Sequence, residues 1–145
     1  MREPKLKNLL QTLENLDYQF VNETEALNAR LVEFEERLNS LRLPVSASVN
    51  LPVLQTERDR IAVRRMTYDE YDGAHGLWIV VERPGDPQWE WTPLVQAPNW
   101  VRRVAPRVFM SIVEQMVTQA QKMVSGVSQA LSEAEKVLDE FSDSL

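Results

Sequence analysis

Four residues in one short stretch, Asp69, Glu70, Asp72 and His75, have side chains that could hold a divalent cation or act as an acid–base pair. They lack the D-x-D-x-D-G spacing of a calcium loop, and the chain has no second histidine and no cysteine to complete a zinc site. Nothing beside them specifies a nucleophile or an oxyanion hole. The pattern favours a solvated hairpin loop with Asp72 and Gly73 at the turn. We therefore predict no metal and no cofactor, although the sequence leaves open whether this loop binds an ion.

Arginines form the second group that could do chemistry. Between Glu57 and Arg107 the chain carries eight arginines and eight acids, and the arginines lie on both sides of a β-patterned region. If the sheet brings them together, they form a basic patch that could stack on bases or bind an acidic peptide. The alternative is pairing with the acids of the same segment. The candidate partner-binding residues are Arg64, Arg65, Trp100, Arg102, Arg103 and Arg107.

Tryptophans are concentrated in "QWEWTPLVQAPNW", which runs from Gln88 to Trp100. Trp89 and Trp91 share one face of a short strand because side chains alternate along a strand, and Trp78 on the neighbouring strand could pair with one of them. We expect these rings to attach a small sheet to helices, since each aromatic buries about 150–250 Å². Trp100 lies outside the alternation and is the tryptophan we expect to face a partner.

Bulk composition narrows the classes of function further. The net charge of −6 argues against a general nucleic-acid binder and against docking on anionic membranes. The sequence has no cysteine, no P-loop and none of the common dinucleotide, hydrolase or zinc-protease motifs, so we expect no enzyme. An enzyme built from carboxylates alone stays open as the minor alternative. No apolar run reaches membrane-spanning length, and we predict a cytoplasmic protein without a secretory signal.

The β pattern covers residues 60–98. Three alternating or apolar runs, over 60–68, 77–83 and 89–94, are separated by turn-rich segments and predict a three-stranded antiparallel meander. Residues 43–59 precede it, and their uncharged, proline-bounded first part predicts a linker or a short edge strand. Residues 99–105 follow it as a short helix or turn, with a helix kinked at Pro106 as the alternative.

Long helices are predicted over residues 4–42 and 106–143. On the first, one apolar residue recurs every seven positions from Leu6 to Leu41, which is typical of a helix-pairing seam. The second has a wider apolar face, with Gly126 in its middle marking either a close helix crossing or a kink. The predicted seam and oligomer contacts are Leu13, Phe20, Leu27, Phe34, Leu41, Met116, Met123, Val124, Gly126 and Leu131.

Together these patterns predict one α+β domain over 1–145, with the two helices folded as an antiparallel coiled-coil hairpin that flanks the meander. This layout is similar to that of prefoldin subunits, and the resemblance concerns only the order and arrangement of the elements. It favours a non-enzymatic oligomeric scaffold, adaptor or chaperone-like factor that binds protein partners and copies of itself. One alternative is a small module that binds a peptide or nucleic acid through its Trp/Arg-rich sheet. The other is a bacterial or phage accessory factor, such as an antitoxin, an immunity protein or a secretion chaperone.

Overall fold

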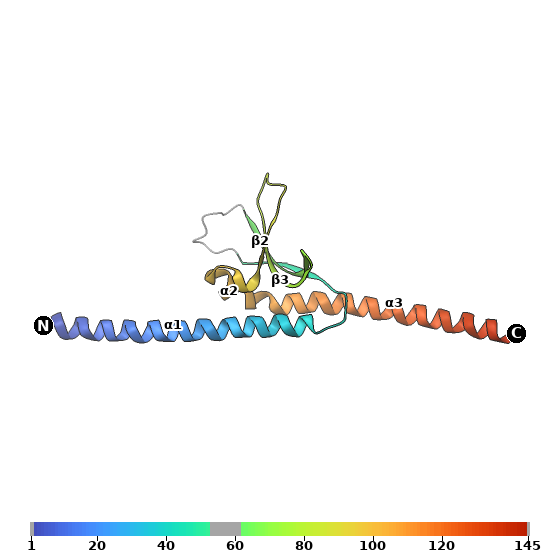
Figure 1. Cartoon of the computed structure of the whole chain (residues 1–145), viewed down its shortest axis with the longest axis horizontal. Coiled ribbons are helices and arrows are strands. Elements are labelled where there is room, and N and C mark those ends of the chain that lie inside the picture. The colour runs from blue at the N-terminus through green and yellow to red at the C-terminus, as the bar shows by residue number, and fades with distance from the viewer. Residues whose placement is uncertain (1, 53–61, 145) are drawn as a thin grey trace.

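The computed structural model describes residues 2–52 and 62–144 and is an α+β fold (Figure 1). A four-stranded antiparallel sheet stands on a layer made by two long helices. The elements in chain order are α1 (Arg2–Asn39), β1 (Ala47–Asn50), β2 (Val63–Tyr71), β3 (Ala74–Glu82), β4 (Glu90–Pro93), η1 (Leu94–Gln96), α2 (Asn99–Val104), η2 (Ala105–Val108) and α3 (Phe109–Asp143).

The N-terminal helix α1 is 38 residues long because its sequence contains no glycine and only one proline, Pro4, which lies in the first turn. It ends three residues earlier than predicted, at Asn39. There the Ser40 N–H donates to the carbonyl of Glu36 at 3.0 Å, and the Ser40 hydroxyl donates to the carbonyl of Arg37 at 2.7 Å. These bonds close the last turn before the chain reaches Pro44.

The sheet has the order β1-β2-β3-β4, and every neighbouring pair is antiparallel. Asp72 and Gly73 form the predicted turn between β2 and β3, with φ angles of 52° and 78°. Positive φ at both positions is the conformation of a two-residue type I′ hairpin, which suits the twist of the strands it joins. The turn therefore sets the register in which Tyr68 pairs with Leu77.

The predicted three-stranded meander is wrong, because the sheet has a fourth strand. It lies within residues 43–59, whose first part was predicted to be either a linker or a short edge strand. Residues Ala47–Asn50 form β1 and pair with β2 from Arg65 to Tyr68. Gln115 on α3 fixes this edge strand, since its side chain accepts from the Ser48 N–H and donates to the Ser48 carbonyl, both at 3.1 Å. This tertiary bond explains why four uncharged residues form a strand here. Residues 53–59 of the predicted linker, and residues 60 and 61 of the predicted first strand, lie outside the described residues.

The predicted antiparallel hairpin is also wrong. The two long helices run in the same direction and overlap only where the last turns of α1 meet the first turns of α3, so the termini lie at opposite ends of the molecule (Figure 1). Phe34 stacks on Phe109 in this overlap, with ring centroids 4.0 Å apart. The strands and α2 carry the chain back before α3 begins. Because the likeness to the layout of prefoldin subunits depended on that hairpin, it is lost as well.

The core lies between the helix layer and one face of the sheet. Met66 and Leu77 contribute from the sheet, Leu31 from α1, Val101 from α2 and Ile112 from α3, all less than 3% exposed. Because Leu77 and Ile79 face this core, the alternation of β3 places Trp78 and Val80 on the opposite face. That second face of the sheet is called the outer face below.

Pro106 lies in the 3₁₀ turn η2, between α2 and α3, so α3 begins at Phe109. Proline is tolerated there because its missing N–H falls at the start of the turn. None of the helices in the described part of the chain has the length and apolar content that a bilayer crossing requires.

Candidate functional site

Two helix segments project from the body of the molecule in opposite directions (Figure 1). We call residues 4–20 the α1 arm and residues 124–143 the α3 arm. Both arms carry large apolar side chains that are about half exposed or more. These are Leu6, Leu9, Leu10, Leu13, Leu16 and Phe20 on the α1 arm, and Val124, Val127, Leu131, Val137, Leu138 and Phe141 on the α3 arm.

Each arm prolongs a stripe that is buried in the middle of the molecule. On α1, Leu13 is 62% exposed, yet it belongs to the same seven-residue row as Leu27 and Phe34, which pack on the core. On α3, Val137 is 63% exposed and continues the row of Met116, which is 5% exposed. A contiguous apolar stripe of this kind on a helix is suited to bind another helix.

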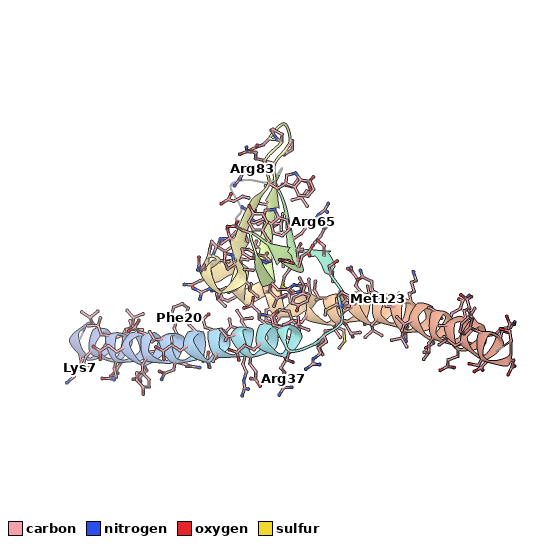
Figure 2. The ribbon with its side chains drawn as sticks, turned by 45° about the vertical axis from the view of Figure 1, so that its right-hand side comes forward. Lys7, Phe20, Arg37, Arg65, Arg83 and Met123 are labelled. Atoms are coloured by element: carbon pink, nitrogen blue, oxygen red, sulfur yellow. The ribbon has the colours of Figure 1, made fainter. Side chains whose placement is uncertain are left out.

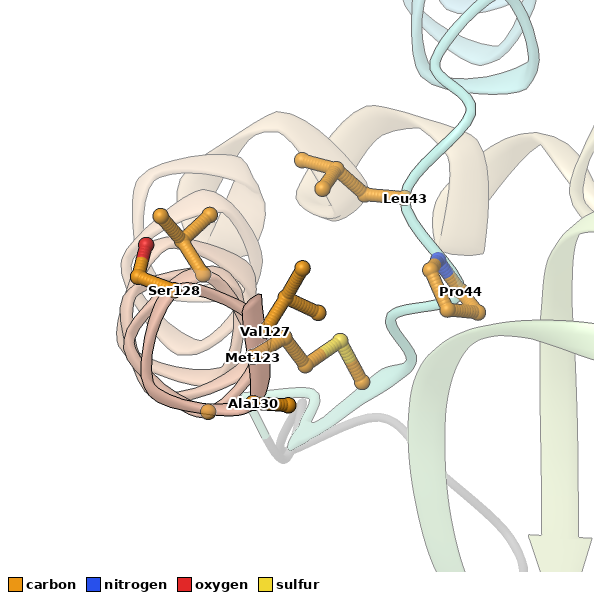
Figure 3. Close-up of a pocket in the computed structure, with 8 residues that line it drawn as sticks. Leu43, Pro44, Met123, Val127, Ser128 and Ala130 are labelled. Carbon is orange, nitrogen blue, oxygen red and sulfur yellow. The ribbon is translucent and has the colours of Figure 1, made fainter. Parts of the chain in front are cut away.

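An apolar groove lies at the base of the α3 arm, where the chain leaving α1 crosses α3 (Figure 3). Leu43 and Pro44 form one wall, and Met123 and Val127 face them from α3; the cavity measures about 560 Å³. Gly126 also lines this groove, and a Cβ placed on it would meet no atom within 4 Å. The close helix crossing considered for Gly126 is therefore absent among the described residues, and open space takes its place.

A narrow cleft lies at the base of the α1 arm, where α2 packs across α1. It is lined by Phe20, Thr24, Leu27, Asn28, Asn99, Arg102 and Arg103, and we call it the α2 notch. Arg102 donates to the side-chain oxygens of Asn28, at 2.6 Å, and of Asn99, while Arg103 donates to the Asn99 carbonyl at 3.3 Å. Phe20 lies on the side of α1 that faces α2, whereas Arg37 points away from the sheet (Figure 2). The notch therefore combines an apolar floor with two fixed cations.

The six residues of the predicted Arg/Trp patch do not form one surface. Arg64 lies on the core side of the sheet, with its guanidinium 5.0 Å from the centre of the Trp100 ring. Arg65 is on the outer face and pairs with Glu82 at 3.4 Å. Burial, and then the positive charge of Arg83, lower the pKa of Arg64.

Trp100 itself is partly buried and packs against the core. The most exposed of the tryptophans is Trp89, at 47%, in the segment before β4. Arg102 and Arg103 belong to the α2 notch, and Arg107 is exposed on η2. The structure therefore divides the predicted patch between the core side of the sheet, the outer face, the notch and η2.

Aromatic rings cover the outer face of the sheet. Tyr71 stacks on Trp91 with centroids 4.5 Å apart, and Trp78 meets Trp91 edge to face at 6.2 Å, as the predicted pairing of these tryptophans requires. The Trp78 ring N–H donates to the carbonyl of Asp69 at 3.2 Å. The prediction that these rings attach the sheet to the helices is wrong, because they lie on the face that points away from the core.

The acidic hairpin loop adopts the solvated arrangement. Glu70 and His75 pair across the hairpin, and the Asp69 carboxylate accepts the N–H of Glu70 at 2.7 Å. His75 places its ring edge-on to Tyr68, with centroids 4.8 Å apart. Within residues 2–52 and 62–144, no cluster of three or more His, Asp or Glu side chains is arranged as a metal site.

The apolar rows were predicted from the sequence. That the rest of the chain leaves their outer halves exposed was not predicted. The groove at Leu43 and Pro44 and the notch formed by α2 were not predicted either. One signal for the arms was available: a helix of about 38 residues is on the order of 57 Å long, more than a body of this size can cover. The groove and the notch had no local signal, because each is made by segments far apart in the sequence.

Comparison with known proteins identifies no relative of this chain. No protein-family model matches the chain, and neither the curated proteins nor the solved structures contain a significant match. The arms, the groove and the notch are therefore the features of the molecule that bear on its function.

Proposed function

We propose that this chain is a non-enzymatic structural protein, an oligomeric scaffold whose two arms bind helices in a coiled-coil manner. The single observation that carries the proposal is the exposed apolar stripe on both arms. Transferring a Leu or Phe side chain from water to an apolar contact contributes roughly 1.5–3 kcal/mol, and each arm offers six large apolar side chains. Soluble monomers rarely expose a contiguous apolar surface of this extent.

The chemistry of the rest of the molecule supports a structural role over a catalytic one. The acidic loop is a hairpin turn, and of the arginines of the predicted patch Arg65 pairs with Glu82 and Arg102 donates to Asn28 and Asn99. A cysteine-free chain is compatible with a reducing compartment, and we place the scaffold in the cytoplasm.

Light scattering across a concentration series tests the proposal. The mass should rise above the 16.8 kDa of one chain, because the arms are covered only by association. Leu13→Glu with Leu16→Glu should return the mass to that of one chain by placing charges in the stripe. Asn8→Glu with Gln11→Glu adds the same charge to the polar side of the same helix and should leave the mass unchanged. A mass of one chain at every concentration contradicts the proposal.

A second candidate function is peptide binding by the outer face of the sheet, favoured by the Tyr71, Trp78 and Trp91 cluster. Tyr71 is 40% exposed and its stack with Trp91 presents a flat aromatic surface of the kind that binds extended peptides. Tryptophan fluorescence tests it: a red emission that shifts when a peptide is added, and that no longer shifts in Trp91→Leu, supports binding. A blue, quencher-resistant emission that no peptide changes contradicts it.

A further inference from the structure

We infer that the partner of each arm is a second copy of this chain, bound head to tail, with the α3 arm of one copy lying parallel to the α1 arm of the next. The inference rests on the proposed scaffold function and names the partner and the direction of pairing. Three independent features of the chain carry it: the faces of the arms, their lengths and their charges.

The faces of the arms fit head-to-tail pairing. In the middle of the molecule the last turns of α1 lie beside the first turns of α3, the two helices run in the same direction, and Phe34 stacks on Phe109 (Figure 1). Each arm prolongs the stripe used in that contact. In a second copy shifted along the helix direction, the α3 arm would meet the α1 arm of the first copy through the faces that carry Phe109 and Phe34.

Stretches of equal length on the two arms can pair. On the α1 arm, Phe20 at the notch and Leu6 near the tip are 14 residues apart, and Ala130 in the groove and Ser144, which directly follows the α3 arm, are also 14 residues apart. Each distance is about 21 Å along a helix. When Leu6 of one copy reaches the groove of the next, the end of the α3 arm therefore reaches the notch.

The charges of the arms distinguish between possible partners. The α3 arm carries five acids and one lysine, a net charge of −4, so two α3 arms side by side would repel. The α1 arm carries two lysines, Glu14 and Asp17, and is neutral. In the head-to-tail arrangement the acidic end of the α3 arm arrives beside Arg102 and Arg103 of the α2 notch.

Pairing two α1 arms with each other is the competing arrangement, and it would leave both α3 arms uncovered. Head-to-tail pairing covers both arms with one type of contact. A contact between different surfaces of identical chains is heterologous, so it produces an open chain of copies or a ring.

The spacing between copies follows from the register. Within one chain Phe34 lies beside Phe109, a difference of 75 residues, and between copies Leu6 would lie beside Ala130, a difference of 124 residues. Successive copies are then shifted by 124 − 75 = 49 residues, about 73 Å along the helices. Since 49 residues are seven heptads, the same apolar rows stay in contact along the whole assembly.

Single cysteines test the arrangement cleanly, because the chain has none of its own. Leu13 and Val137 differ by 124 residues and should lie side by side in neighbouring copies. A mixture of Leu13→Cys and Val137→Cys chains should give a disulfide-linked pair on mild oxidation, and a chain with both substitutions should give a ladder of linked multimers. Ring closure within one chain is excluded, because the two arms project in opposite directions (Figure 1).

The matched control is Ser132→Cys, which places a thiol on the polar side of the α3 arm and should link to Leu13→Cys at least tenfold more slowly than Val137→Cys does. Light scattering and circular dichroism on each variant verify assembly and folding. Linking of Leu13→Cys to itself, or of Val137→Cys to itself, overturns head-to-tail pairing and leaves the scaffold function standing. Assemblies of high mass without any linking overturn it as well. A mass of one chain for every variant and for the parent protein contradicts the scaffold function itself.

Discussion

At the scale of single residues, Glu35 joins α1 to the sheet. Its carboxylate accepts the N–H of Leu77 at 2.7 Å, and Leu77 is 1% exposed. Glu35→Ala should lower the free energy of unfolding by about 1–3 kcal/mol, since it leaves a buried N–H without an acceptor. Urea denaturation measures this loss. Glu36→Ala, one residue further on the exposed side of α1, should change the value by less than about 0.5 kcal/mol, and equal losses in the two variants would contradict the role of Glu35.

Tyr68 gives the molecule a sensitivity to alkaline pH. Its hydroxyl donates to the side-chain oxygen of Asn39 at 3.0 Å, and burial, followed by the negative charge of Glu35, raises its pKa. The folded state keeps a proton that the unfolded state releases at about pH 10. This stabilisation is complete below that pH and is lost as the pH rises through the folded-state pKa.

Stability measured from pH 9 to 12 should therefore fall less steeply in Tyr68→Phe than in the parent protein. Tyr18, which is 73% exposed on the α1 arm, provides the control, and Tyr18→Phe should keep the parent slope. Identical slopes in all three proteins would contradict the assignment to Tyr68.

At the scale of elements, the two glycines Gly126 and Gly76 should respond in opposite ways to alanine. A Cβ on Gly126 meets open space, so Gly126→Ala should stabilise α3 by up to about 1 kcal/mol through helix propensity. A Cβ on Gly76 would lie 2.8 Å from the carboxylate oxygen of Glu35, which is held by its bond to Leu77. Gly76→Ala should therefore destabilise the protein. Thermal melts followed at 222 nm, at a concentration where the chain is monomeric, compare the two; a loss of stability in Gly126→Ala would contradict the open groove.

At the scale of the whole molecule, association should depend on the charge at the end of the α3 arm. Asp139→Asn, Glu140→Gln and Asp143→Asn together should weaken assembly in low salt, because these acids would face Arg102 and Arg103 of the next copy. The difference should shrink in 0.5 M salt, where the screening length is about 4 Å. Sedimentation at both salt concentrations measures it.

The control for that experiment removes three acids away from the arms. Glu36→Gln, Glu70→Gln and Asp72→Asn change the net charge equally and should leave assembly as it is in the parent protein. Stronger assembly after neutralising the α3 arm would instead indicate that two α3 arms meet, because like charges would then have been removed from one contact.

Much of the local structure could be predicted from the sequence, because it depends on neighbouring residues. The proline-free run of α1, the turn at Asp72 and Gly73 and the pairing of Trp78 with Trp91 each follow from backbone preference or side-chain alternation. Strand β1 could be predicted only as an alternative to a linker, since four uncharged residues become a strand only when β2 and Gln115 supply their hydrogen-bond partners. The outward position of the tryptophans likewise depends on which face of the sheet meets the helices.

The sequence by itself determined which face of each long helix is apolar, since a seven-residue row needs nothing beyond the helical period. Only the tertiary structure decided what that face meets. The sheet and α2 return the chain so that α3 starts beside the second half of α1 and runs on in the same direction, which leaves the two arms uncovered at opposite ends. A periodic stripe carries no information about the direction or the identity of its partner, because packing two apolar helix faces is nearly as favourable parallel as antiparallel.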